Sequence, residues 1–96
     1  MVNGVRGEVV ASLAGTERRL CLTLGALAEI ETGLGVAGMA ALAERMKVLS
    51  ARDLMVVLAA LLRGGGEVAL ADGLASAPVD PREAAEAVAK AFAAAV

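Results

Sequence analysis

The fold is decided by one stretch of sequence, SARDLMVVLAALLRGGG, which runs from Ser50 to Gly66. Ser50 and Asp53 have the spacing of a helix capping box, so a helix is expected to begin just after Ser50. This helix should continue to Arg63, because the three glycines that follow readily end a helix. Residues 54–62 are apolar on nearly every side, which is typical of a helix that lies at the centre of its domain or contacts a partner chain.

Upstream of this helix, residues 4–24 are expected to form a β-hairpin. Apolar residues recur at every second position on both sides of a turn that contains Gly15, a pattern typical of paired strands. These positions are Val9, Ala11, Leu13, Leu20, Leu22 and Leu24. A hairpin of two strands is only marginally stable in water, so its apolar face needs cover from the helices.

The rest of the chain reads as helix. Helical spacing begins near Leu24 and stops at Gly33 and Gly35, and a second helix is expected over about 36–47. Leu70 and Leu74 could share a face of a short helix. A last helix should begin at Asp80, which precedes Pro81 as an N-cap, and carry its apolar face on Ala84, Val88, Phe92 and Ala95, with a Glu86–Lys90 pair opposite.

These segments predict an α+β fold, in which an N-terminal β-hairpin is followed by four or five α-helices and most residues are helical. We expect a single domain over 1–96, with the hairpin at 4–24, a helical core at 25–66, and a variable loop and C-terminal helix at 67–96.

Composition excludes several classes of protein. The 96 residues are 58% hydrophobic but only 1% aromatic, and about a quarter of them are alanine, which favours helices. The net charge of −2 argues against nucleic-acid binding, which normally needs a basic excess. The longest apolar run, Leu54 to Leu62, would rise only about 14 Å as a helix, too little to cross a bilayer core of about 30 Å. The first residues lack the hydrophobic core of a secretory signal, so we expect a cytoplasmic protein that binds no membrane.

Few residues could carry catalysis. Histidine is absent and Cys21 is the only cysteine, which excludes the usual zinc sites, Cys–His pairs and Ser–His triads. Cys21 then reads as a small strand residue. A Ser–Lys dyad stays formally open, but Ser12, Ser50 and Ser76 read better as a strand residue, a helix cap and a loop residue. The sequence therefore predicts a non-enzymatic protein with no catalytic, cofactor-binding or metal site.

Two glycine patterns resemble phosphate-binding motifs. Residues 64–66 are Gly-Gly-Gly, but they follow a predicted helix instead of preceding one, and Glu67 comes next, so helix termination is the better reading. Gly33, Gly35 and Gly38 match part of a dinucleotide-binding fingerprint, but the preceding segment is helical and no βαβ unit follows.

Several side chains have both a structural and a binding interpretation. Glu29 and Glu31 point in different directions on one helix and are expected to be solvated or capping. Arg18 and Arg19 form either an exposed turn or a small basic spot for an acidic partner. The methionines at 39, 46 and 55 read as core residues, with an adaptable partner groove as the alternative.

The order of features resembles a family of small tail proteins from gene transfer agents and prophages, grouped as phage tail assembly chaperones or tail tube proteins. The resemblance covers about Gly4 to Gly66. It rests on the charged hairpin and on two stretches, Leu22-Thr23-Leu24-Gly25-Ala26-Leu27-Ala28-Glu29-Ile30-Glu31 with the Leu34-Gly35 that follows it, and Ser50-Ala51-Arg52-Asp53-Leu54 with the helix that ends at Arg63-Gly64.

The resemblance implies a role in building a phage-like tail by protein–protein binding, either as chaperone or as component. The partners would be other tail proteins, such as tail tube and tape measure proteins, and the chain could be incorporated in the particle or form a homo-oligomer. Two surfaces are candidates for binding: the hairpin edge and the helix around Leu54 to Leu62. The partner-binding residues themselves stay unknown. A small dimerising adaptor or regulatory domain unrelated to tails is the alternative, and an enzyme accessory subunit is a third.

Overall fold

The computed structural model describes residues 7–95. Two strands come first, β1 (Val9–Leu13) and β2 (Thr16–Leu20). Five α-helices and one short 3-10 helix follow in this order: α1 (Leu24–Leu34), α2 (Met39–Met46), α3 (Ala51–Gly64), α4 (Val68–Asp72), η1 (Leu74–Ser76) and α5 (Pro81–Ala95). The predicted α+β fold, a hairpin followed by helices, is therefore confirmed. The predicted hairpin residues 4–6 lie outside the described part of the chain.

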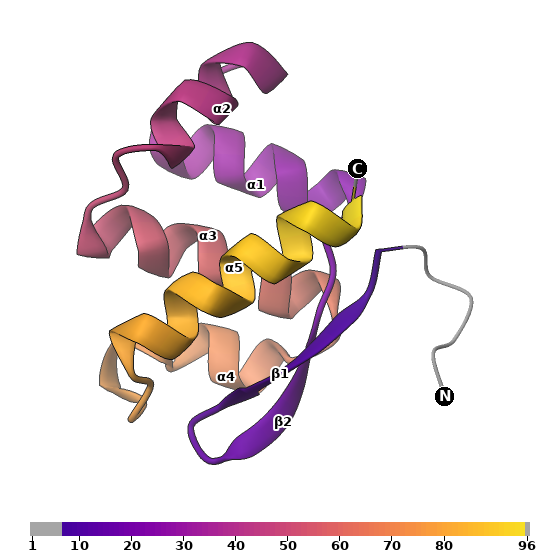
Figure 1. Ribbon diagram of the computed structural model, residues 1–96, viewed down its shortest axis with the longest axis vertical. Coiled ribbons are helices and arrows are strands. Elements are labelled where there is room, and N and C mark those ends of the chain that lie inside the picture. The colour runs from indigo at the N-terminus through magenta and orange to yellow at the C-terminus, as the bar shows by residue number, and fades with distance from the viewer. Residues whose placement is uncertain (1–6, 96) are drawn as a thin grey trace.

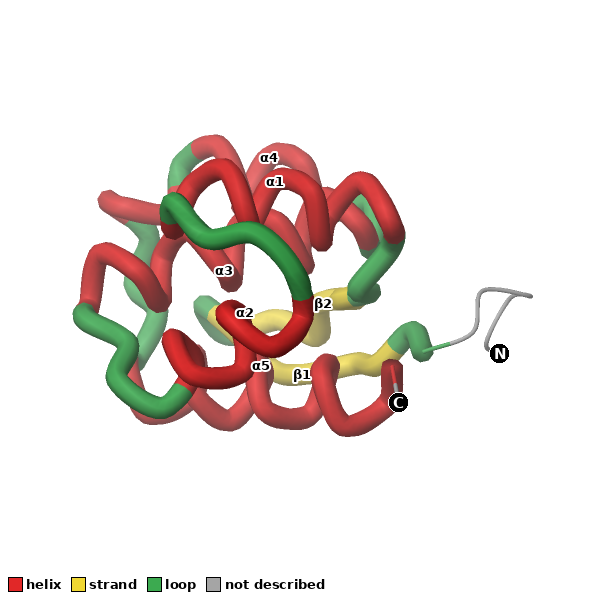
Figure 2. Tube along the Cα trace, turned by 90° about the horizontal axis from the view of Figure 1, so that it is seen from above, coloured by secondary structure: helices red, strands yellow, loops and turns green. Residues whose placement is uncertain are grey.

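Helix α3 lies in the middle of the molecule (Figure 1). It packs against α1, α4, η1, α5 and β2. Seen from above, α5 and the hairpin lie on one side of α3, and α1 and α4 lie on the other (Figure 2). The sequence left open whether this apolar helix is central or exposed to a partner. The structure places most of it at the centre.

The core consists of small and aliphatic side chains. Val57, Leu58, Ala60, Leu61 and Leu62 of α3 are all buried to at least 98%. Around them pack buried residues of the other elements: Leu13, Leu20, Ala26, Ile30, Leu34, Leu42, Ala71, Leu74, Ala84, Ala87, Val88 and Ala91. Alanine faces on α5 let that helix approach α3 closely, so a chain with one aromatic residue can still form a continuous core.

The hairpin turns its apolar face toward the helices. Its register pairs Val9 with Leu20 and Ala11 with Arg18 on one face, and Val10 with Arg19 on the other. Leu20 is fully buried, whereas Val10 is 42% exposed, so the alternation predicted from the sequence separates core from solvent. The two strands are joined at Ala14 and Gly15, which both have positive φ angles of 55° and 77°.

The C-terminus of α3 lies directly against the chain that leaves β2. A Cβ atom on Gly64 would overlap the Cys21 carbonyl, and one on Gly65 would overlap the Arg19 carbonyl. The Cys21 N–H donates to the Leu61 carbonyl over 3.0 Å. The glycines were predicted only to end a helix. They end it, and they also make room for the backbone of the hairpin.

The helix ends follow their local signals. Thr23 caps α1 through its hydroxyl, and Gly35 ends α1 with a left-handed φ of 70°. Ser50 and Asp53 form the predicted capping box: the Ser50 hydroxyl accepts from the Asp53 N–H over 3.1 Å, and Asp53 accepts from the Ser50 N–H over 3.3 Å. In contrast, α2 has no side-chain cap and a single buried residue, Leu42.

Several predicted boundaries and faces are wrong in detail. The second strand ends at Leu20, because Thr23 caps a helix that already includes Leu24. The second helix begins at Met39, since Gly38 with a φ of 89° cannot join it. Leu70 and Leu74 fall in two separate elements, α4 and η1.

On α5, the predicted face and ion pair also change. Ala95 is exposed, and the buried face continues instead through Ala87 and Ala91. The Lys90 ammonium donates to the Val10 carbonyl over 2.8 Å, where the sequence predicted a pair with Glu86.

Among the described residues, no single helix is long and apolar enough to cross a membrane. Helices α1 and α2 meet that criterion only when taken together, and they are bent by 65° at the break between them.

The close approach at Gly65 gives the first testable prediction. Gly65→Ala should destabilise the fold by at least about 2 kcal/mol, because the new methyl group meets backbone atoms that cannot rotate away. Gly25→Ala is the matched control: its nearest neighbour would be the Thr23 hydroxyl at 3.9 Å, so stability should stay the same or rise by up to about 1 kcal/mol. Urea denaturation measures both, and equal effects of the two variants would contradict the packing described here.

Candidate partner-binding groove

The first candidate surface, the hairpin edge, is largely covered by the chain itself. On the β2 side, the Arg19 N–H donates to the Glu67 carboxylate over 3.0 Å, and the Cys21 N–H is bound by α3. On the β1 side, Lys90 of α5 binds the outward carbonyl of Val10. One outward backbone group at each of these three positions is therefore already bonded within the chain, which leaves less of the hairpin edge for a partner strand.

The second candidate surface, α3, is buried except for one stripe. Arg52, Met55, Val56, Ala59 and Arg63 recur at helical spacing and line a common hollow. Met55 is 41% exposed. This stripe is what remains of the helix for a partner to contact.

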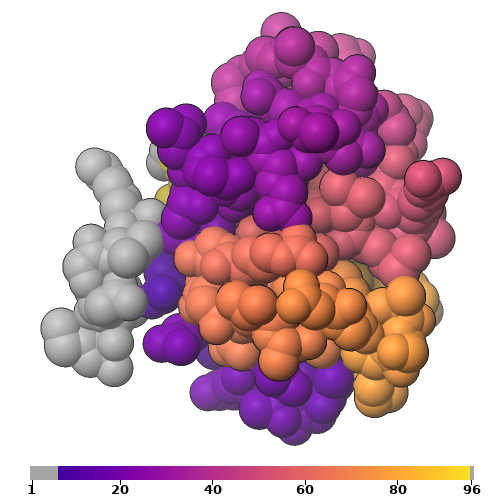
Figure 3. Space-filling model, turned by 180° about the vertical axis from the view of Figure 1, so that it is seen from behind, coloured from indigo at the N-terminus to yellow at the C-terminus, as the bar shows by residue number. Residues whose placement is uncertain are grey.

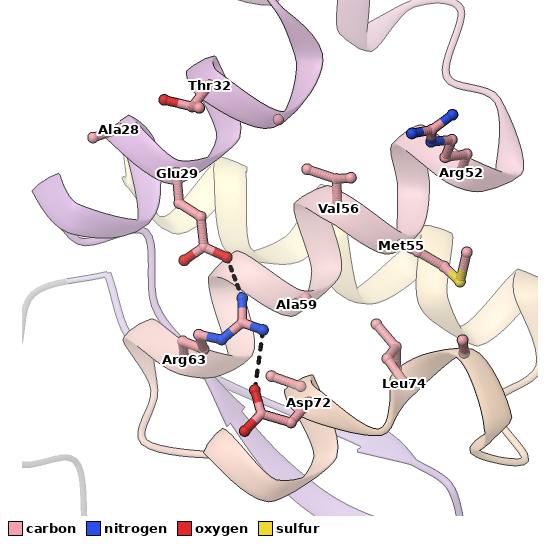
Figure 4. Close-up of a pocket in the computed structure, with 13 residues that line it drawn as sticks. Ala28, Glu29, Thr32, Arg52, Met55, Val56, Ala59, Arg63, Asp72 and Leu74 are labelled. Atoms are coloured by element: carbon pink, nitrogen blue, oxygen red, sulfur yellow. Dashed lines mark hydrogen bonds and ion pairs between the residues drawn. The ribbon is translucent and has the colours of Figure 1, made fainter.

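The stripe forms the floor of an open groove with a volume of about 750 Å³. Helix α1 supplies one wall through Ala28, Glu29, Thr32 and Gly33, and the opposite wall comes from Ala71, Asp72, Leu74 and Ala75 of α4 and η1. Figure 3 shows this face of the molecule, with α1 and α4 separated by α3, and Figure 4 shows the side chains that line the groove.

Three charged side chains close one end of the groove. The Arg63 guanidinium binds the Glu29 carboxylate on α1, and it binds the Asp72 carboxylate on α4 over 3.1 Å (Figure 4). This end therefore carries one cation and two anions. Arg52 lies at the other end and has no ion-pair partner among residues 7–95. The groove is thus net acidic at one end and basic at the other.

Of these groove residues, the sequence gave individual interpretations to Glu29, Gly33, Met55 and Leu74. The helix around Leu54 to Leu62, which was one of the two candidate binding surfaces, also includes Val56 and Ala59. Glu29 pairs with Arg63 instead of being simply solvated or capping. Met55 supports the partner-groove interpretation of the methionines. Arg52 and Arg63 were not recognised as binding residues, although their spacing along one face of α3 was a signal that could have found them.

The other residues with a binding interpretation have structural roles. Glu31 accepts from the Gly38 N–H over 3.0 Å and so caps the loop before α2. Arg18 and Arg19 both lie within 4.0 Å of the Glu67 carboxylate, so neither of these two arginines forms an unpaired basic spot. Met39 is 58% exposed, which contradicts its interpretation as a core residue, while Met46 is half-buried.

The glycine patterns have no phosphate-binding geometry. Gly33 lies inside α1, where an added Cβ would overlap Val56, and Gly35 caps that helix. The fingerprint spacing therefore spans the end of α1, where the residues directly before Gly33 are helical and do not form a strand. Gly64, the last residue of α3, and Gly65 lie against the hairpin, as described above.

Within residues 7–95, the serines form no Ser–Lys dyad. Ser50 is the cap of α3, and the Ser76 hydroxyl donates to the Gly73 carbonyl over 3.3 Å. Ser12 and Lys90 line the same cleft of about 240 Å³, but no hydrogen bond joins them and Lys90 is bound to Val10. Within residues 7–95, no group of three or more carboxylate or thiol side chains is placed to hold a metal ion.

Arg45 and Asp53 connect three helices next to the groove. Arg45 forms a two-pronged pair with Asp53, with contacts of 3.0 and 3.2 Å, and donates to the Leu34 carbonyl over 2.8 Å. Desolvation favours the neutral form of Asp53, but the Ser50 N–H and the Arg45 guanidinium outweigh it, so the pKa of Asp53 lies below its ordinary value.

Together, the fold and the groove define a class of protein: a small, mostly helical domain with an open groove along its core helix. The family model described as "Phage tail tube protein, GTA-gp10" matches residues 6–96, nearly the whole sequence. The chain therefore belongs to this family of phage and gene transfer agent tail proteins. The family is structural and not enzymatic. No curated protein and no solved structure matches the chain.

The Asp53 network predicts a pH dependence of stability. A carboxylate with a lowered folded pKa stabilises the fold above its unfolded pKa of about 3.9, and this contribution is lost as the pH falls through the folded pKa. Asp53→Asn should therefore be less stable than wild type at neutral pH, and the difference should narrow below about pH 4. Urea denaturation across the pH range measures this. Glu44→Gln, which alters a surface pair with Lys47, is the control with a small effect.

Cys21 provides a separate prediction. Its side chain is 1% exposed, and burial together with the nearby Glu8 carboxylate raises the pKa of the thiol. Alkylation by iodoacetamide in buffer should be at least about a hundredfold slower than in denaturing urea, because the reagent needs an opening of the fold and a thiolate. Equal rates in the two conditions would show that the junction between β2 and α1 is not closed.

Proposed function

We propose that the chain acts in tail morphogenesis as an assembly chaperone, by binding a segment of another tail protein. The groove along α3 is the observation that carries this proposal. It leaves Met55 exposed and Val56 and Ala59 half-buried on the core helix α3, whose other apolar residues are mostly buried.

The covered hairpin edges also favour a chaperone. A subunit that builds a tube needs complementary surfaces toward its neighbours on both sides. The groove of about 750 Å³ lies on one face of the molecule, and one outward backbone group at each of Arg19, Cys21 and Val10 is already bonded within the chain. One groove suits a helper that holds one partner segment at a time.

A tail tube component is the second candidate, and the description of the family favours it. In both cases the partners are other tail proteins, with the tube and tape measure proteins as the first to examine. Membership in a tail family favours either role over an adaptor unrelated to tails. We expect the chain to act in the cytoplasm during assembly.

A deletion strain and purified particles test the proposal. Deleting the gene should abolish complete tails, and mass spectrometry of particles from the intact strain should find the chain absent or far below one copy per tube subunit. A copy number equal to that of the tube subunit would make the chain a structural component. Complete tails in the deletion strain would overturn both roles.

A further inference from the structure

The groove along α3 differs from a small-molecule pocket. It is open to solvent, and its charged groups lie at the two ends instead of converging on one point at its centre. Pockets for small ligands enclose most of the ligand surface and aim a few polar groups at it. The occupant must therefore cover a surface, as a segment of protein does.

The backbone around the groove indicates which kind of segment fits. Its floor and walls are formed by helices α1, α3 and α4 with η1, whose backbone groups are used within the helices. An extended segment would leave its own N–H and C=O groups without partners on this surface. A helix bonds its own backbone and presents only side chains.

The length of the groove and the charges at its two ends further define the helix that would fit it. Arg52 and Arg63 are eleven positions apart on α3, which corresponds to about 16 Å of helix, or roughly three turns. Between them the floor is apolar. At one end Glu29 and Asp72 outnumber Arg63, and at the other end Arg52 lacks an ion-pair partner within the described part of the chain.

We propose that the groove binds an amphipathic helix of a partner protein, which places a basic side chain near Glu29 and Asp72 and an acidic side chain near Arg52. Apolar side chains at helical spacing would contact Met55, Val56 and Ala59 between these ends. This inference rests on the proposed role in protein binding and adds the site, the conformation and the charge pattern of the partner segment.

Two synthetic helical peptides of about 15 residues serve as probes. Both carry the same apolar face and one tryptophan; the first has glutamate at one end and lysine at the other, and the second has lysine at both ends. Because the chain contains no tryptophan or tyrosine, the peptide fluorescence reports binding directly. The wild-type chain should bind the first peptide roughly threefold to tenfold more tightly than the second. This holds for either direction of the peptide helix along the groove.

Charge reversal at Arg52 provides the sharpest test. Arg52→Glu makes both ends of the groove acidic, so the preference should invert toward the peptide with two lysines. Arg82→Glu makes the same change of net charge on exposed α5, outside the groove, and should keep the wild-type preference. If neither peptide binds at millimolar concentration, or if both variants shift the preference equally, the proposal is wrong.

A second pair of variants tests the floor. Ala59→Leu fills the middle of the groove and should lower the affinity for the first peptide at least about tenfold. Ala93→Leu, on the exposed side of α5, should leave this affinity unchanged. Thermal unfolding checks that both variants fold. Sedimentation of the chain alone tests whether a second copy occupies the groove. If Ala59→Leu changes the mass that sedimentation measures, a second copy is the occupant and the assignment to a partner helix is wrong.

The same variants separate this inference from the proposed function. If tails require the gene and Ala59→Leu supports them as well as wild type does, the groove is not the partner site, although the role in assembly stands. If tails form without the gene, the proposed function fails regardless of the peptide measurements.

Discussion

The rest of the structure depends on the backbone contact between the end of the hairpin and the C-terminus of α3. The Cys21 N–H donates to the Leu61 carbonyl, and Gly64 and Gly65 allow this approach because they lack side chains. The contact fixes the hairpin on one side of α3 and directs the chain into α1 on the other side. Leu20 and Cys21 become buried at the junction, which protects a backbone hydrogen bond from water.

This arrangement also determines which surfaces remain for partners. Docking the hairpin on α3 uses the outer edge of β2, and α5 supplies Lys90 to the edge of β1. Helices α1 and α4 stand apart on the far side, where Arg63 holds both through Glu29 and Asp72. The groove is thus the side of the core helix that the chain itself does not cover.

The sequence predicted much of this fold because its signals are local. The capping box at Ser50, the alternation in the strands and the proline start of α5 each depend on neighbouring residues, and the structure shows all three. The features that could not be predicted from the sequence depend on contacts between distant segments. The bond from Lys90 to Val10, the pairing of Arg18 with Glu67 and the role of Gly65 each join parts of the chain at least 46 residues apart. The groove residues were visible only as spacing on one helix face, and the walls that make them a site come from α1 and α4.

Amide hydrogen exchange at Cys21 tests the central claim most directly. If the hairpin is held on α3 by a buried backbone bond, the Cys21 amide should exchange only through global unfolding and rank with the amides in the middle of α3. Its protection should then change in parallel with the free energy of unfolding in dilute denaturant. Exchange as fast as that of the exposed turn at Gly15 would contradict the account, because the hairpin would then open independently of the core helix.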